Sequence, residues 1–189
     1  MHNSNNLLLE IDDNIDKSIA SFIQSKIITE QYLDDLIEKK ICVTEALGCT
    51  KEQPLVFTNG VFDVLHKGHL TYLAQAKNLG YKLIIGLNSD LSTKMLAKGE
   101  DRPINSHFDR QIMLASLLFV DYVVIFEEKT PIELLKKIKP HIYVKGGDYT
   151  INSLPETPIV QSWGGIVEIL SFVQGYSTTS ILCKIRKGS

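Results

Sequence analysis

The stretch LVFTNGVFDVLHKGHL (55–70) decides the fold. Its first four residues form a short apolar run, which is typical of a buried strand, and a helical pattern begins near Lys67. Polar residues and a glycine lie between the two. A strand that turns directly into a helix is typical of a chain that builds a parallel sheet.

The same alternation continues to the end of the chain. Four more strands are expected at 82–87, 122–126, 141–144 and 166–172. Helices are expected at 106–118, after Pro131, within 153–163 and from near Ser177. This order predicts an α/β fold, a Rossmann-like doubly wound five-stranded parallel sheet with helices on both faces. Residues 16–47 show helical periodicity with Thr29 as a cap, so we expect a helical N-terminal extension over residues 1–50 and the sheet domain over 51–189.

Composition limits the class of partner. The 189 residues carry a formal net charge of −2, which predicts no nucleic-acid partner. Apolar runs fall far short of the ~20 residues that span a bilayer, and the N-terminus has no basic leader, so neither a membrane partner nor a signal peptide is expected. Three cysteines without a CxxC spacing suggest reduced thiols and a cytoplasmic location. A zinc site made from Cys42 and Cys49 stays open.

Polar clusters follow the predicted strands. They lie at 59–69, 88–90, 145–149 and 175–180. The carboxyl ends of parallel strands meet at one edge of a sheet, and ligands of open α/β sheets bind there. The sequence therefore predicts that these clusters form one site.

Two histidines stand where the first strand of the sheet gives way to its helix. His66 and His69 share one side of the first helical turn, and Gly68 leaves room for a ligand to approach the backbone. Free N–H groups and the helix dipole at such a position favour an anion. A phosphate site is the preferred interpretation, while a structural histidine pair and a zinc site remain alternatives.

Three further clusters could complete the site. Ser177, Thr178 and Thr179 can cap the last helix and offer a second anion pocket, although an ordinary helix cap has the same pattern. Lys98 and Arg102 lie in a basic loop that could close over phosphates or simply face solvent. Lys145, Gly147 and Asp148, together with Asp90 after the second strand of the sheet, could contact a sugar or a base, and Asp90 could instead be a helix cap.

The segments HKGH (66–69) and GYSTTSI (175–181) together resemble the nucleotidyltransferase superfamily with its HxGH motif. VKGGDY (144–149) with GYSTT is similar to the adenylyltransferase domain of the bacterial ADP-heptose synthases, over roughly residues 26 to 187. This resemblance implies that 51–189 is a nucleotidyltransferase domain, in a stand-alone form without the sugar kinase that many members carry. It also implies a homodimer.

The resemblance implies transfer of AMP from ATP to a heptose 1-phosphate, which gives ADP-heptose and pyrophosphate for lipopolysaccharide core synthesis. Mg²⁺ is expected on the nucleotide phosphates, without a metal site built from protein side chains. Two alternatives remain: a cytidylyltransferase acting on glycerol phosphate or a similar phospho-alcohol, and a catalytically silent nucleotide-binding protein.

The predicted site residues fall into three groups. The predicted catalytic residues are His66, His69 and Lys98. The predicted nucleotide-binding residues are Thr58, Asn59, Gly60, Phe62, His66, His69, Lys145, Gly147, Ser177, Thr178 and Thr179. The residues predicted to bind the acceptor substrate are Asp63, Asn88, Asp90, Arg102 and Asp148.

Overall fold

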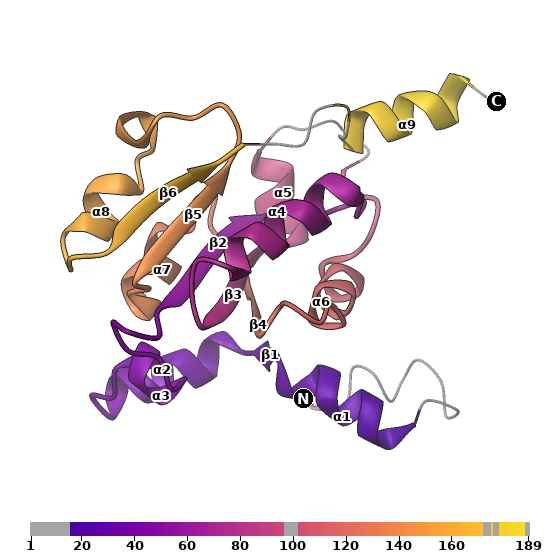
Figure 1. Cartoon of the computed structure of the whole chain (residues 1–189). Helices are drawn as coiled ribbons and strands as arrows, with labels where there is room; N and C mark the ends of the chain where they lie inside the picture. Colours follow the sequence, from indigo (N-terminus) through magenta and orange to yellow (C-terminus); the bar gives the residue numbers. More distant parts are fainter. Residues whose placement is uncertain (1–15, 97–101, 172–174, 176–177, 188–189) are drawn as a thin grey trace.

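A parallel sheet of six strands forms the centre of the protein (Figure 1). The computed structural model describes residues 16–96, 102–171, 175 and 178–187. The strand order is β1-β4-β3-β2-β5-β6. The strands are β1 (Ile27–Ile28), β2 (Leu55–Gly60), β3 (Lys82–Asn88), β4 (Tyr122–Phe126), β5 (Ile142–Gly146) and β6 (Ile166–Leu170).

Helices cover both faces of this sheet (Figure 1). One face packs against α2 (Glu30–Glu38), α3 (Val43–Ala46), α7 (Ile132–Ile138) and α8 (Thr157–Gln161). The other face packs against α4 (Lys67–Lys77) and α6 (His107–Ala115), with α1 (Lys17–Ser25) beside α6. The remaining elements are α5 (Asp90–Met95), the 3₁₀ turn η1 (Ile151–Ser153) and α9 (Thr178–Lys187), which extends away from the sheet.

Burial on both faces explains the apolar runs of the central strands. In β3 every residue from Leu83 to Asn88 is buried. Ile84 packs into the cluster under α7 and Ile85 into the cluster under α4, because successive side chains of a strand point to opposite faces. A strand covered on both sides reads as a continuous apolar run, which is the pattern that predicted it.

The strand order reverses at β2. From β2 the chain runs outward to β3 and β4, then crosses back to add β5 on the other side of β2 and β6 beyond it. Thr58 of β2 pairs with Ile85 on one side and Val144 on the other. Helices leave β2 and β5 toward opposite faces, so a crevice opens between their carboxyl ends. The predicted polar clusters follow strands that end at this edge.

The doubly wound parallel sheet is confirmed, but it has six strands and not five. The extra strand, β1, belongs to the segment expected to be purely helical. Ile27 pairs with Val123 of β4, and the Val123 N–H donates to the Lys26 carbonyl at 2.8 Å. A two-residue strand has no alternation that a sequence pattern can reveal. The division of the chain at residue 50 stays a prediction.

Most helix boundaries agree with the sequence within a few residues, and Thr29 caps α2 as expected. One detail differs, because Pro131 is the N-cap of α7 and not its first helical residue. The short helix expected within 153–163 is α8, and the 3₁₀ turn η1 precedes it.

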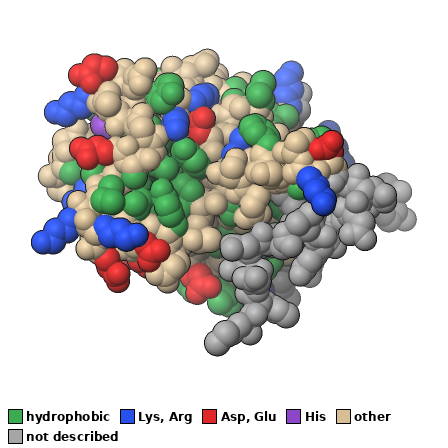
Figure 2. Space-filling view, turned by 90° about the horizontal axis from the view of Figure 1, so that it is seen from below, with side chains coloured by type: hydrophobic (Ala, Val, Ile, Leu, Met, Phe, Trp, Pro, Cys, Tyr) green, Lys and Arg blue, Asp and Glu red, His purple; other side chains and the backbone are tan. Residues whose placement is uncertain are grey.

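A second hollow, a groove of about 400 Å³, lies between α2, α3 and α7. Ile37 and Ile41 are exposed in it, and Lys40, Lys136 and Lys139 also line it. Figure 2, the view from below, shows hydrophobic side chains gathered in one patch with charged side chains around it. Lys139 precedes β5, so the groove lies toward the amino ends of the strands. It is therefore separate from the edge where the polar clusters meet.

Within the described part of the chain, no helix is long and apolar enough to cross a membrane.

Leu33 tests whether α2 is an integral part of the core. Its side chain is fully buried in the cluster under α7, whereas Ile37, four residues later, is 45% exposed. Leu33→Ala should lower the free energy of unfolding by about 2–5 kcal/mol, since it leaves a cavity that the surroundings fill only in part. Urea unfolding would measure the change. Ile37→Ala is the matched control and should cost less than about 1 kcal/mol; equal costs for the two variants would mean that α2 does not pack as described.

Candidate active site

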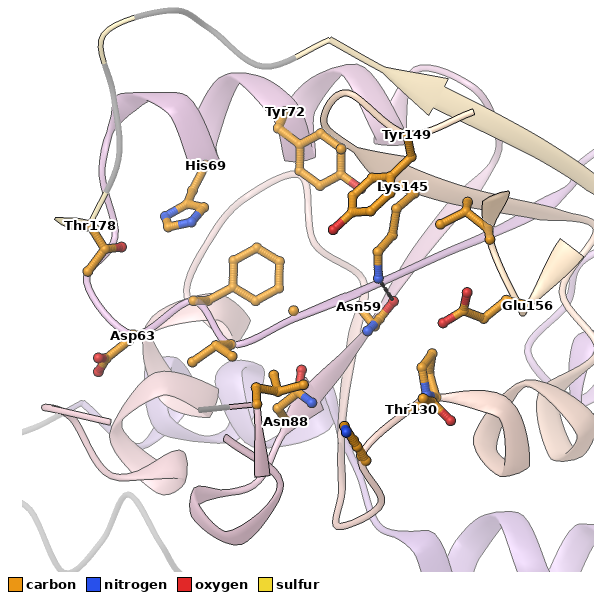
Figure 3. A pocket seen from close by; sticks show the side chains of 18 of the residues that line it. Asn59, Asp63, His69, Tyr72, Asn88, Thr130, Lys145, Tyr149, Glu156 and Thr178 are labelled. Atoms are coloured by element: carbon orange, nitrogen blue, oxygen red, sulfur yellow. Dashed lines mark hydrogen bonds between the residues drawn. The ribbon is translucent and has the colours of Figure 1, made fainter. Parts of the chain in front are cut away.

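A cavity of about 830 Å³ opens at the carboxyl ends of β2 and β5 (Figure 3). Its walls are the β2–α4 loop, the first turns of α4 and α9, the segment before α7, the end of β5 and the segment before α8. It collects predicted site residues that are far apart in the sequence. These are Asn59, Gly60, Phe62, Asp63, His66, His69, Asn88, Arg102, Lys145, Thr178 and Thr179.

His66 is the N-cap of α4. Its backbone is extended, and its Nδ1 accepts a hydrogen bond from the His69 backbone N–H at 3.3 Å. A ring nitrogen that accepts carries no proton, so the neutral ring holds its proton on Nε2 and can donate from there. Burial lowers the pKa of His66, against the opposing effect of a backbone hydrogen bond. The neutral form that caps the helix is therefore favoured near pH 7.

The two histidine rings form a stack. Their centroids are 3.8 Å apart and their planes differ by 17°. Two positive charges at this separation would repel, which disfavours a doubly protonated pair. The Phe62 ring meets His69 edge-on at 5.3 Å, so His69 is held between an aromatic edge and the other imidazole. Both rings thus line the cavity in a fixed orientation at the N-terminus of an 11-residue helix.

Gly60 allows this arrangement. A Cβ at Gly60 would lie 2.9 Å from Cε2 of Phe62, closer than such atoms approach in proteins. Phe62 itself adopts a positive φ of 49°, which a bulky side chain rarely does. This unusual backbone conformation accompanies the contact between the Phe62 ring and His69, and such conformations cluster at functional sites.

Thr58 does not reach the cavity, which is a correction to the sequence prediction. Its side chain is fully buried, and its hydroxyl lies 2.6 Å from the Tyr72 hydroxyl, which donates to the Val144 carbonyl at 3.1 Å. Burial raises the pKa of Tyr72 far above its usual range, so the phenol stays a donor. Tyr72 therefore ties α4 to β2 through Thr58 and to β5 through Val144, beneath the site.

Asn59 is held in one orientation at the end of β2. Its Oδ1 accepts from the Tyr143 hydroxyl and from Lys145 Nζ, each at 3.0 Å (Figure 3). Both partners donate, so the oxygen of the amide must face them and the NH₂ group must face the other way. Asn59 and Lys145 both line the cavity.

Asp63 anchors the loop that carries Arg102. Its buried carboxylate accepts a hydrogen bond from Arg102 Nε at 2.5 Å. It also accepts hydrogen bonds from the backbone N–H groups of Ile104 and Asn105 at 2.8 and 2.9 Å. These bonds occupy the oxygens that were expected to bind the acceptor substrate. Asp63 instead fixes the position of Arg102, whose side chain lines the cavity. Lys98 of the same loop lies outside the described residues, so its role stays a prediction.

The first turn of α9 forms the remaining wall of the site. Thr178 and Thr179 line the cavity, and Figure 3 shows Thr178 at the same end as His69. Ser177, the predicted cap of this helix, lies outside the described residues. Two helix N-termini, those of α4 and α9, thus meet one cavity, and both favour a bound anion.

The family model described as cytidylyltransferase-like matches residues 57–181, which include most of β2, the histidine pair and the start of α9. The chain belongs to this family. It is a nucleotidyltransferase.

Named relatives agree with the family. The chain is 52% identical over 136 residues to the D-beta-D-heptose 1-phosphate adenylyltransferase of Bordetella bronchiseptica, covering 72% of this chain and 84% of that protein. It is 43% identical over 177 residues to the bifunctional protein HldE of Campylobacter concisus, covering 94% of this chain and 34% of that protein. The chain thus spans about a third of the length of this bifunctional relative.

A solved structure supports the fold of the enzyme. The lipopolysaccharide core biosynthesis protein of Thermoplasma volcanium matches with a TM-score of 0.53 and 27% sequence identity. The match covers 66% of this chain and 98% of that one.

Asn88 and Asp90 of the enzyme are organised by Arg110, a residue that sequence reasoning missed. The Arg110 side chain is fully buried. Its Nη1 donates to the carbonyls of Val61 and Asn88 at 2.6 and 2.8 Å, its Nη2 donates to Asp90 Oδ1 at 2.7 Å, and its Nε donates to the Asn105 carbonyl at 3.0 Å. One guanidinium thus joins the ends of β2 and β3 and the loop before α6.

Asp90 is not among the residues that line the cavity. Burial alone would raise the pKa of its carboxyl, but hydrogen bonds from Arg110 and His107 outweigh this and lower it. His107 Nδ1 lies 3.1 Å from Asp90 Oδ2. The Asp90 carboxylate is therefore paired with Arg110 and His107, and the structure does not place it against a substrate. Asn88 does line the cavity, and its side-chain amide donates to Ser92 Oγ.

The predicted KGGDY cluster contributes less than expected. Gly147 has a φ of 127° and its N–H donates to the Leu170 carbonyl, so it turns the chain and pairs with β6. The Asp148 side chain is exposed, and neither residue lines the cavity. Tyr149, the last residue of the cluster, does line it. Thr130 and Glu156 also line it, and no local motif predicted these two, because distant segments bring them to the cavity.

The histidine pair has no protein-built metal centre around it in the described residues. Across the described residues, no group of three or more His, Cys, Asp or Glu side chains could hold a metal ion. The zinc alternative for His66 and His69 therefore lacks a ligand set in this part of the chain.

Arg110 should be required for both stability and activity. Arg110→Met keeps much of the apolar volume but leaves three carbonyls and the Asp90 carboxylate without their donor. We expect the free energy of unfolding to fall by about 3 kcal/mol or more, as when one partner of a buried ion pair is removed. Thermal and urea unfolding would measure it. Lys136→Met, at an exposed ion pair, should change it by less than about 1 kcal/mol. A fully stable Arg110→Met protein would contradict the structural role.

Proposed function

We propose that the enzyme transfers AMP from ATP to a heptose 1-phosphate, releasing pyrophosphate and forming ADP-heptose for lipopolysaccharide core synthesis. The observation that carries the proposal is the stacked His66–His69 pair at the N-terminus of α4, in the same cavity as the N-terminus of α9. The relative from Bordetella bronchiseptica, a D-beta-D-heptose 1-phosphate adenylyltransferase, supports the choice of nucleotide and acceptor.

The reaction needs charge stabilisation more than it needs a base. A phosphate oxygen of the sugar 1-phosphate attacks the α-phosphorus of ATP, and the bond from that phosphorus to the bridging oxygen breaks. The electron pair leaves with pyrophosphate. The attacking oxygen is already anionic, so no side chain has to remove a proton. Catalysis then depends on donors fixed where negative charge increases.

Each wall of the cavity takes one role in this proposal. The His66 Nε2–H and the His69 ring donate to oxygens of the α- and β-phosphates. Thr178, Thr179 and the N–H groups of α9 hold the β- and γ-phosphates, and Arg102 neutralises charge nearby. Lys98 of the same loop would close over the phosphates. Lys145 lies on the acceptor side, near Asn59.

Mg²⁺ is proposed as a companion of the nucleotide, bound mainly by phosphate oxygens and water. This fits the described cavity lining, whose carboxyl groups are Asp63 and Glu156. Asp63 is occupied by Arg102 and two backbone N–H groups. When bound, the ion would neutralise charge on the triphosphate, and the side chains named above would orient the reacting groups.

The first test is a substrate panel. Purified enzyme with ATP and a heptose 1-phosphate, supplied as each anomer, should release pyrophosphate at a rate at least about 10²-fold above reactions that lack the sugar. ADP-heptose should form in equal amount. Faster turnover with CTP and glycerol phosphate would favour the cytidylyltransferase alternative. ATP binding without pyrophosphate release across the panel would favour a catalytically silent protein.

The second test concerns His69. His69→Ala should lower kcat by about 10²-fold or more, the scale for losing one fixed donor to developing charge. Steady-state pyrophosphate release would measure it, and His69→Gln, which keeps an N–H donor, should recover part of the rate. Gln75→Ala, at an exposed position on the same helix, is the control and should stay within about twofold. Wild-type turnover in His69→Ala would remove His69 from the mechanism.

A further inference from the structure

Glu156 has a buried carboxyl oxygen that the mechanism above does not use. The residue is 4% exposed and lines the cavity from the segment that leads into α8. Among the residues that the structure describes, its Oε2 has no hydrogen-bond partner. Leaving a buried acceptor unsatisfied costs roughly 1–3 kcal/mol, and more for a charged group. Such a group in a native site calls for a partner that the protein itself does not supply.

Neighbouring side chains do not fill that role. The Tyr143 hydroxyl is committed to Asn59 Oδ1. Burial raises the pKa of Tyr143, and the negative charge of Glu156 raises it further, so the two groups are near neighbours without sharing a hydrogen bond. In Figure 3 the Glu156 carboxyl group points into the cavity on the side of Asn59 and Thr130. The carboxyl group is thus directed at whatever fills the cavity.

The two ends of the cavity differ in charge. At one end stand the N-termini of α4 and α9, with His69 and Thr178, and these attract phosphate. At the other end the Glu156 carboxylate repels phosphate but accepts from hydroxyl groups. The ligand atoms beside Glu156 are therefore not phosphate oxygens, and groups with O–H or N–H donors suit this position. Lys145, hydrogen-bonded to Asn59, is a cationic side chain on the same side.

The in-line geometry of the reaction indicates which part of the substrates lies beside Glu156. Attacking and leaving oxygens lie roughly in line on opposite sides of a phosphorus under attack. If pyrophosphate leaves toward α9, the acceptor enters from the side away from α9. That side carries Asn59, Thr130, Lys145 and Glu156 (Figure 3). A volume of about 830 Å³ is near the upper end for small-ligand cavities, which suits two substrates together.

We propose that Glu156 recognises the acceptor sugar, by accepting hydrogen bonds from hydroxyl groups of a pyranose 1-phosphate whose phosphate points toward the histidines. This inference rests on the proposed sugar-phosphate adenylyltransferase activity. Glu156 acts in sugar binding and selectivity, and it takes no part in the movement of charge at the α-phosphorus. Thr130, which also lines the cavity, supplies a further hydroxyl for the same sugar.

Glu156→Gln tests the assignment with almost no change in shape. The amide accepts less strongly and adds an unwanted donor, so KM for the heptose 1-phosphate should rise about 10-fold or more, as expected for losing a hydrogen bond to a charged group. KM for ATP should stay within about twofold. The control is Glu168→Gln, which makes the same chemical change at an exposed position on β6 and should alter neither constant.

Singly deoxygenated analogues of the acceptor make the test specific. In the wild-type enzyme, removal of the hydroxyl that Glu156 accepts from should cost about 10-fold or more in kcat/KM. In Glu156→Gln the same analogue should cost much less, because the two losses concern one interaction and do not add. The wild-type comparison with the analogues stands on its own if the variant fails to fold.

Each outcome points to one conclusion. Unchanged sugar KM in a folded Glu156→Gln enzyme overturns the inference, and so does a rise in KM for ATP alone, which would place Glu156 at the nucleoside. The inference is also overturned if the kcat/KM of the wild-type enzyme is unchanged for every singly deoxygenated analogue. A wild-type enzyme that releases no pyrophosphate with any heptose 1-phosphate instead contradicts the proposed function, so the two failures are distinguishable.

Discussion

One buried guanidinium holds the active end of the sheet together. Arg110 reaches from α6 beneath the carboxyl ends of β2 and β3, where it donates to two strand-end carbonyls and to a carboxylate. A planar group with fixed donors imposes angles as well as distances on its partners. The β2–α4 loop and the first turn of α5 therefore cannot shift independently. The histidine pair depends on this frame, since the backbone that leads into His66 begins at Val61.

Above this frame, the end of the cavity lined by the two histidines is organised by local contacts. His66 caps the helix on which His69 sits, and Phe62 holds the His69 ring from the other side. All three residues lie within eight positions of one another, so the geometry of the pair follows from a short strand, a glycine and a helix start. This is why the hypothesis of an anion site here could be drawn from the sequence alone.

Local patterns predicted the fold well for the same reason. Apolar runs and helix caps identified β2 to β6, and their alternation predicted a doubly wound parallel sheet. Long-range contacts were not predictable. Arg110 bonds to Val61 across 49 positions, and Tyr143 bonds to Asn59 across 84. Thr58 looked like a ligand contact because it precedes the turn, but strand alternation directs it to Tyr72 instead. Homodimerisation stays a prediction.

β1 has a consequence for the behaviour of the folded chain in concentrated solution. The outer side of a parallel sheet normally exposes unpaired N–H and carbonyl groups, which can recruit a strand from another molecule. Two residues of β1 occupy this side of β4 at Val123 and Val124, and the buried stem of Lys26 secures them through the Leu117 carbonyl. By covering this part of the β4 edge, β1 disfavours edge-to-edge aggregation, and the same N-terminal segment also packs on the core.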